Sequence, residues 1–172
     1  MAGGTMVVPE EGAAFPSIVA DAKVTHASLV PTQLYRYMSE EEGIAALKLL
    51  KVILLGGAPA PTGMVERAHM SGIKVYTTYG MTEMSSQITT TAPDTDPEHQ
   101  EASGQVLKYR ELKIADDHEI WVRGSTLFAG YVNGDKIDPA RDGEGWFATG
   151  DLGEMDDAGY LNVLGRKDNM FI

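Results

Sequence analysis

The segment Ile73–Glu83, which reads Ile-Lys-Val-Tyr-Thr-Thr-Tyr-Gly-Met-Thr-Glu, contains the pattern that decides the fold of this chain. Its first seven residues alternate apolar and polar side chains and are rich in β-branched and aromatic types, which predicts a strand over Ile73–Tyr79. We expect Gly80 to break the strand and Thr82 to cap a short helix whose first turn contains Glu83. A strand that ends in a glycine turn and opens a helix presents backbone N–H groups, and these favour an anion.

The side chains around this turn offer three kinds of ligand contact. Tyr79 has an aromatic face, Thr82 has a hydroxyl, and Glu83 has a hard oxygen ligand of the kind that Mg²⁺ prefers. This site could therefore bind a planar base, a phosphate and a metal ion. A purely structural interpretation stands beside it, in which Thr82 caps a helix, Glu83 complements the helix dipole and Tyr79 belongs to the core.

The segments upstream of this strand alternate between strand-like and helix-like patterns. Alternation of this kind predicts an α/β fold with a mainly parallel sheet and helices packed on it. Ser39 and Glu42 have the spacing of a capping box, so a helix is expected to begin there. The expected strands are Thr5–Val8, Val24–Val30, Val52–Leu55 and Ile73–Tyr79, and the expected helices lie at Ile18–Lys23, Pro31–Met38, Ile44–Leu50 and Pro61–Ser71.

A glycine pair follows the apolar strand Val52–Leu55 and is a second candidate site. In parallel sheets, ligands lie outside the carboxyl ends of the strands, which is where Gly56–Ala58 and Tyr79–Glu83 are expected. Because glycine has no side chain, a flat ring could lie directly on these peptide planes. The alternative is that Gly-Gly-Ala-Pro forms only a tight turn.

Composition narrows the class of protein. The net charge of −11 and the lack of a basic tail disfavour nucleic acid or an anionic membrane as the main partner. The sequence contains no cysteine, which excludes disulfides, thiolate zinc sites and cysteine nucleophiles. The N-terminal residues show no signal-peptide pattern, and the most apolar stretch, Leu47–Leu55, is short and contains two lysines. We therefore expect a cytoplasmic protein without membrane insertion.

The composition changes near Thr91. Residues 92–103 are polar and rich in turn formers, which predicts a linker or loop between an α/β part at 1–91 and a β-rich subdomain at 104–172. Asn133-Gly134 and Asp142-Gly143 are typical of two-residue hairpin turns, and the subdomain is expected to form a small barrel or distorted sheet. Its expected strands are Leu112–Ile114, Glu119–Val122, Leu127–Val132, Trp146–Thr149, Leu152–Met155 and Tyr160–Leu164.

Three clusters in the β-rich part carry candidate ligand-binding residues. They are Arg123–Tyr131, Phe147–Gly153 and Gly165–Met170. A carboxylate on a Gly-Asp turn, such as Asp151, can accept two hydrogen bonds from a vicinal diol, and an arginine such as Arg166 can donate to sugar hydroxyls or phosphate oxygens. Alternatively, these two residues form a surface ion pair or cap turns.

Taken together, the motifs occur in the order and approximate spacing of one known group of enzymes. The chain resembles the adenylate-forming superfamily, which includes acyl- and aryl-CoA synthetases, luciferases and the adenylation domains of peptide synthetases. Within it, Val24–Leu34 and Met81–Gln87 look most like the o-succinylbenzoate–CoA ligases of menaquinone biosynthesis. The matching motifs are Gly-Gly-Ala-Pro at 56–59, Tyr-Gly-Met-Thr-Glu at 79–83, Arg-Gly-…-Gly-Tyr at 123–131, Thr-Gly-Asp at 149–151 and Gly-Arg-Lys-Asp at 165–168.

The resemblance implies a two-step ligase reaction that uses ATP, Mg²⁺ and coenzyme A. A carboxylate, o-succinylbenzoate for the branch named above, attacks the α-phosphate of MgATP and gives an acyl-adenylate and pyrophosphate. Coenzyme A then displaces AMP to form a thioester. The chemistry requires positioning and charge neutralisation at the phosphate more than covalent help from the protein. The implied partners are therefore a small carboxylic acid, ATP and CoA.

The resemblance also implies roles for individual residues. Thr82 and Glu83 are the implied catalytic residues, with Thr82 at the α-phosphate and Glu83 at the magnesium. Asp168 is the implied hinge about which a C-terminal domain rotates. The residues that would face the acyl group are Ser85, Ser86 and Gln87. The residues that would bind the nucleotide are Gly56, Gly57 and Ala58 around the adenine, Tyr79 against its ring, Thr82 at the α-phosphate, Asp151 at the ribose hydroxyls, Arg166 nearby, and Gly80 and Met81, for which no particular contact is implied.

Two features of the superfamily are missing from this sequence. It contains no Ser/Thr/Gly-rich phosphate loop, and it ends at Ile172, before the domain that carries the adenylation lysine. Lys167 is not assumed to replace that lysine. We therefore expect a fragment of a larger enzyme that is inactive alone. Two alternatives remain open, namely a fragment of another acyl- or aryl-CoA ligase, and a naturally short nucleotide-binding or interaction module without catalysis.

Overall fold

The computed structural model describes residues 3–168 of the chain. The chain divides into two compact units, Met1–Tyr76 and Thr77–Ile172, and each is described by itself. The expected domain limits at residues 91 and 104 stay a prediction. Asn169 and Met170, the last two residues of the Gly-Arg-Lys-Asp cluster, lie outside the described part. Within that part, no helix combines the length and the apolar character needed to cross a membrane.

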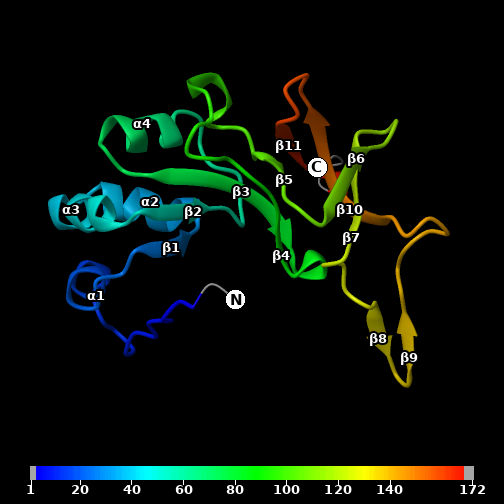
Figure 1. Ribbon diagram of the computed structural model, residues 1–172, viewed down its shortest axis with the longest axis horizontal. Helices are drawn as coiled ribbons and strands as arrows, with labels where there is room; N and C mark the ends of the chain where they lie inside the picture. Colours follow the sequence, from blue (N-terminus) through cyan, green and yellow to red (C-terminus); the bar gives the residue numbers. More distant parts are fainter. Residues whose placement is uncertain (1–2, 169–172) are drawn as a thin grey trace. The chain divides into compact units, whose positions relative to one another are not determined.

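The first unit contains a parallel strand pair and four helices. Strands β1 (His26–Leu29) and β2 (Val52–Leu55) run parallel and pair from His26 with Val52 to Leu29 with Leu55 (Figure 1). The buried side chains come from strands and helices alike, with Ile53 and Leu47 both fully buried. The helices are α1 (Phe15–Asp21), α2 (Pro31–Met38), α3 (Glu41–Leu49) and α4 (Met64–Met70).

Several local expectations for this unit hold and others are wrong. The helix expected at Pro31–Met38 is confirmed, because proline at the first helical position needs no hydrogen bond there. Residues Thr5–Val8 form no strand. Ser39 does not cap α3. It is the C-cap residue of α2, where its hydroxyl donates to the carbonyl of Tyr35 at 2.8 Å, and Glu40 is the N-cap residue of α3. The helix expected from Pro61 begins only at Met64.

The segment Ile73–Glu83 contributes the first strand and the turn of a hairpin. Strand β3 (Val75–Met81) continues through Gly80 and pairs antiparallel with β4 (Ser86–Thr90), which pairs in turn with β5 (Gln105–Val106). The expected break at Gly80 is wrong, because the missing side chain serves close strand packing: a Cβ atom there would overlap the carbonyl of Ser86. The parallel pair β1–β2 and these antiparallel pairs make the strand arrangement mixed, and a mainly parallel sheet is not confirmed.

Between β3 and β4 the chain makes one short turn and forms no helix of the expected kind. Residues Thr82–Met84 form the 3₁₀-helix η1, and Met81 occupies the N-cap position without a side-chain hydrogen bond. Ser85 adopts a left-handed conformation with φ 58°, which ends η1. The expectation that Thr82 caps a helix is therefore wrong. The hydrogen bonds of the β3–β4 ladder outweigh the helical preference of this short segment.

The second unit is β-rich, as expected. Its main sheet has four antiparallel strands in the order β11-β10-β7-β6, and the two-stranded ribbon β8–β9 extends away from that sheet (Figure 1). Met84, Ile88 and Ile120 are fully buried in the core of this unit. The strands are β6 (Arg110–Ile114), β7 (Glu119–Gly124), β8 (Tyr131–Asn133), β9 (Lys136–Asp138), β10 (Phe147–Met155) and β11 (Leu161–Arg166). The remaining short helix is η2 (Pro97–His99).

The turn signals of this unit have two different outcomes. Asn133-Gly134 joins β8 to β9 as a hairpin, which confirms the expectation. Asp142-Gly143 does not form a hairpin; it lies in the loop between β9 and β10, where the Asp142 carboxylate accepts the N–H groups of Glu144 and Trp146 at 2.9 Å. An aspartate can satisfy backbone donors in a loop as readily as in a hairpin, so the dipeptide alone does not separate the two.

Candidate functional site

A bulge in strand β10 presents the Thr-Gly-Asp motif. The pairing register with β7 shifts between Ala148 and Leu152, and Gly150 within this interval has φ +72°. The Thr149 hydroxyl donates to the carbonyl of Ile120 at 2.7 Å and accepts the N–H of Asp151 at 3.0 Å. The bulge is therefore held by specific hydrogen bonds. The two strands expected at Trp146–Thr149 and Leu152–Met155 are one strand, β10, that continues through this bulge.

The carboxylate of Asp151 is bound from both sides. The Tyr79 hydroxyl donates to Oδ2 at 2.7 Å, and Nη1 of Arg166 donates to Oδ1 at 3.1 Å. Only 15% of the Asp151 side chain is exposed. Burial raises the pKa of the Tyr79 phenol well above its usual range, so it remains a hydrogen-bond donor near neutral pH. Three side chains from β3, β10 and β11 thus converge on one point.

A second network lies on the other side of Gly150. The N–H of Gly150 donates to Oε1 of Glu119 at 2.9 Å, and Nζ of Lys167 donates to the other oxygen of Glu119 at 2.8 Å. Lys167 also donates to Asp117 at 2.7 Å, and this hydrogen bond is the main cause that raises the lysine pKa. The charge of Lys167 is therefore engaged by two carboxylates.

Arg166 links the bulge to Asp168. Its Nη1 also donates to the carbonyl of Thr149 at 3.1 Å, and its Nη2 donates to Asp168 at 3.2 Å. The hydrogen bonds to Asp168 and then Asp151 raise the pKa of the guanidinium. The two predicted residues Arg166 and Asp168 are thus direct partners, although 76% of the Asp168 side chain is exposed.

The η1 turn carries the predicted phosphate and metal residues. The hydroxyl of Tyr131 donates to Oε1 of Glu83 at 2.8 Å, and the N–H of Phe128 donates to the Glu83 carbonyl at 2.7 Å. The Ser85 hydroxyl donates to the carbonyl of Thr126 at 2.9 Å. The segment that follows β7 therefore holds η1 through both backbone and side chains.

An open pocket of about 640 Å³ lies in the second unit beside the bulge and the η1 turn. Among its lining residues are Met81, Thr82, Glu83, Asp151 and Arg166, all of which the motifs singled out. Tyr79 joins the group through its hydrogen bond to Asp151. The other lining residues are Glu119, Tyr131, Ala140, Phe147, Ala148, Thr149 and Gly150.

Other predicted site residues lie elsewhere. Gly56, Gly57 and Ala58 follow β2 in the first unit, where Gly57 has φ +81°. Ser85, Ser86 and Gln87 are not among the residues that line the pocket. Gln87 instead donates to the Thr78 hydroxyl at 3.2 Å within the β3–β4 hairpin. The acyl-facing role of Ser85–Gln87 stays a prediction.

Sequence reasoning did not identify three residues that organise the site. Thr149 and Tyr131 belong to motifs that the sequence analysis identified, but no role was predicted for either residue. Glu119 had no distinguishing signal, because an acidic residue that begins a strand is expected to face solvent. In the structure only 8% of Glu119 is exposed. A buried carboxylate with a backbone donor and a lysine partner is recognisable only from tertiary contacts.

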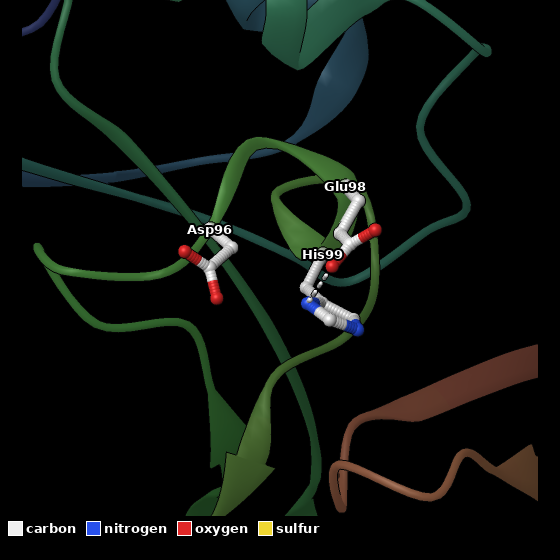
Figure 2. Close-up of side chains that lie close together, drawn as sticks. All are labelled: Asp96, Glu98 and His99. Atoms are coloured by element: carbon white, nitrogen blue, oxygen red, sulfur yellow. Dashed lines mark ion pairs between the residues drawn. The ribbon is translucent and has the colours of Figure 1, made fainter.

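A separate group of possible metal ligands lies around η2. Figure 2 shows Asp96, Glu98 and His99, whose candidate ligand atoms lie within 4.8 Å of one another. Nδ1 of His99 is 3.9 Å from Glu98 and Nε2 is 3.4 Å from Asp156, while the ring stacks on Tyr160 at 4.3 Å. These contacts place the imidazole between the carboxylates of Glu98 and Asp156.

The comparisons with known proteins identify the family. A sequence model of the family described as "AMP-binding enzyme" matches residues 1–132. The 2-succinylbenzoate–CoA ligase of Salmonella typhimurium is 39% identical over 150 residues, which cover 87% of this chain and 31% of that protein. The structure of wild-type Escherichia coli MenE with a bound m-phenylether-linked analogue of OSB-AMS matches with a TM-score of 0.77 and 35% identity, over 94% of this chain and 34% of that one.

A second similar structure was solved with a nucleotide and a metal ion bound. The o-succinylbenzoate coenzyme A synthetase (MenE) of Bacillus subtilis, in complex with ATP and magnesium ion, matches with a TM-score of 0.75 and 34% identity, over 90% of this chain and 34% of that one. The chain thus spans about a third of the length of the relatives it matches. Since the family model covers more than half of the chain, this protein belongs to the family of AMP-binding enzymes, as its motifs predicted.

Proposed function

We propose that this chain is the adenosine-binding part of an ATP-dependent acid–CoA ligase that acts on o-succinylbenzoate. The observation that carries the proposal is the convergence of Tyr79 and Arg166 on the carboxylate of Asp151 beside the pocket. An ionised carboxylate has about four lone-pair sites, so each oxygen of Asp151 keeps one for a ribose hydroxyl while its protein partners stay bound. The acid is proposed from the names of the relatives.

The roles of the other residues follow their motifs. Tyr79 packs against the adenine, Thr82 contacts the α-phosphate, and Gly80 and Met81 belong to the same nucleotide-binding turn. Gly56, Gly57 and Ala58 contribute to adenine binding, a role that rests on their motif alone because they belong to the first unit. The carboxylate of the acid attacks the α-phosphate of ATP and releases pyrophosphate, and the thiol of coenzyme A then loses its proton and displaces AMP from the acyl-adenylate. The protein contributes by holding the reacting groups in line.

The residues at η1 fit a magnesium ion. Mg²⁺ is usually held by one or two carboxylates together with substrate phosphates, and Glu83 and Thr82 line the same pocket. Within residues 3–168, no lysine or arginine forms an ion pair with Glu83, so its charge is available to a cation. Magnesium at this position would neutralise charge on the phosphates. Asp168 is proposed as the hinge that follows the Arg166 contact.

Isothermal titration of the chain with AMP tests the site. We expect weak binding, because the chain lacks the glycine-rich phosphate loop. The Asp151→Ala substitution removes the diol acceptor, and the loss of hydrogen bonds to a charged group should weaken AMP binding by about 10- to 150-fold. Asp157→Ala, at an exposed aspartate in the β10–β11 turn, is the matched control and should leave the affinity unchanged. Equal AMP affinity in wild type and Asp151→Ala would contradict the proposed site.

The substrate is tested in the full-length protein. We expect o-succinylbenzoate to support ATP–pyrophosphate exchange with a higher kcat/KM than benzoate or anthranilate. Preference for another aryl or alkyl acid would leave the adenosine site intact and overturn only the choice of acid.

A further inference from the structure

The hydroxyl of Tyr131 is the side-chain partner that the structure gives to Glu83. It donates to Oε1 at 2.8 Å and leaves Oε2 to other ligands. A phenol is uncharged near neutral pH, so this hydroxyl can serve as a hydrogen-bond donor. Both residues line the same pocket, together with Thr82. The glutamate that faces the proposed phosphate position is therefore restrained by a neutral donor.

The environment of Tyr131 gives this contact a defined geometry. Its ring meets the ring of Phe128 edge to face at 4.8 Å, and Phe128 meets Phe147 edge to face at 5.6 Å. The N–H of Phe128 donates to the Glu83 carbonyl at 2.7 Å. The backbone and the carboxylate of Glu83 are thus held by residues three positions apart on one segment. The edge contact with the half-buried Phe128, which itself packs on the buried Phe147, restricts where the Tyr131 hydroxyl can reach.

We propose that Tyr131 is a positioning residue that orients the Glu83 carboxylate for a divalent cation at the nucleotide phosphates. The proposal rests on the proposed function and extends it to a residue that does not itself contact the ion. A free glutamate side chain loses rotamer freedom when it coordinates a cation, and a prior hydrogen bond reduces that loss. Partners of this kind typically change metal affinity about 10- to 100-fold.

The test uses Mn²⁺ as the probe, added to the full chain with and without AMP. Bound Mn²⁺ broadens the NMR signals of nearby amides, so the concentration that broadens residues 81–85 reports its affinity at η1. We expect Tyr131→Phe to weaken this binding about tenfold. Tyr109→Phe removes a hydroxyl from an exposed tyrosine outside the pocket and is the matched control, which should behave as wild type.

A double-mutant cycle separates positioning from general damage. Glu83→Gln should abolish the broadening at residues 81–85, and adding Tyr131→Phe to Glu83→Gln should change nothing further, since Tyr131 acts through that carboxylate. Tyr131→Phe loses one hydrogen bond to a carboxylate, so its unfolding midpoint should fall, and Mn²⁺ is titrated under conditions in which wild type and variant are both fully folded. Mn²⁺ affinity should fall more than metal-free AMP affinity, whereas a purely structural role of Tyr131 would weaken both equally.

The outcomes distinguish this inference from the proposed function. Wild-type Mn²⁺ affinity in Tyr131→Phe, tighter binding in that variant, or no broadening of residues 81–85 in wild type would each overturn the positioning role. The adenosine site is judged separately by metal-free AMP binding and its loss in Asp151→Ala. If AMP binding depends on Asp151 but Mn²⁺ affinity does not change in Tyr131→Phe, only the inference about Tyr131 fails.

Discussion

A Cβ atom placed on Gly150 would lie 3.1 Å from Nη2 of Arg166, so the glycine leaves room for the arginine that binds Asp151. Gly150 also has φ +72°, a left-handed conformation that costs other residues about 1–2 kcal/mol. Gly159 has φ +81° and nothing within 4 Å of its Cβ position. Both glycines therefore adopt a left-handed backbone conformation, and of the two only Gly150 has a side chain close to its Cβ position.

The comparison of Gly150 with Gly159 leads to the first prediction. Gly150→Ala and Gly159→Ala should each lower the free energy of unfolding by about 1–2 kcal/mol, measured by urea denaturation. Only Gly150→Ala should also weaken AMP binding, because the new methyl group displaces the Arg166 guanidinium from Asp151. Equal AMP affinity in the two variants would show that Arg166 tolerates the methyl group and that its position is not critical.

The Lys167–Asp117 ion pair predicts a pH dependence of stability. The hydrogen bond from Lys167 lowers the pKa of Asp117 below its ordinary value of 3.8. A lowered folded-state pKa stabilises the protein above the ordinary value, and this contribution is lost as the pH falls through the folded-state pKa. Lys167→Met should therefore destabilise the chain at about pH 6 and much less at about pH 2, in urea unfolding experiments.

Lys136→Met is the control for this pH dependence, since Lys136 is an exposed lysine of β9. It should change stability equally little at both pH values. A difference between wild type and Lys167→Met that is the same at both pH values would indicate lost packing of the lysine stem instead of the ion pair.

Tyr79 has two separable functions in the proposed site. Tyr79→Phe keeps the ring and removes the hydroxyl donor to Asp151, so we expect it to lower the free energy of unfolding by about 1.5–3 kcal/mol. It should weaken AMP binding less than Tyr79→Ala, which also removes the surface that stacks on adenine. Calorimetric titration measures the AMP affinity of both variants, and urea denaturation measures the free energy of unfolding. If the two variants bind AMP equally, the ring does not contact the base.

The chain alone should not catalyse carboxylate-dependent ATP–pyrophosphate exchange. It contains no glycine-rich phosphate loop and spans about a third of the length of its relatives. The measurement is exchange of labelled pyrophosphate with o-succinylbenzoate present, against a control without protein. Exchange clearly above that control would show that this chain contains a sufficient catalytic site.

The order and spacing of the motifs determined the family, and the strand and turn patterns after residue 104 indicated the β-rich character of the second unit. The motifs also singled out candidate site residues, five of which line one pocket, because the proposed binding of a phosphate and a diol requires particular side chains next to glycines. The helix at Pro31–Met38 and the turn at Asn133-Gly134 were also predictable, since proline and Asn-Gly act through local backbone geometry.

Only the tertiary structure decided what Gly80 and Glu119 do. Gly80 is a strand residue because β4 approaches its backbone, and a local pattern cannot distinguish that from a glycine that ends a strand. Glu119 is buried because a backbone N–H and a lysine 48 residues later reach its carboxylate. Contacts between residues far apart in sequence leave no periodic signal, so the partners of Asp151, Glu83 and Glu119 become visible only when the chain is folded.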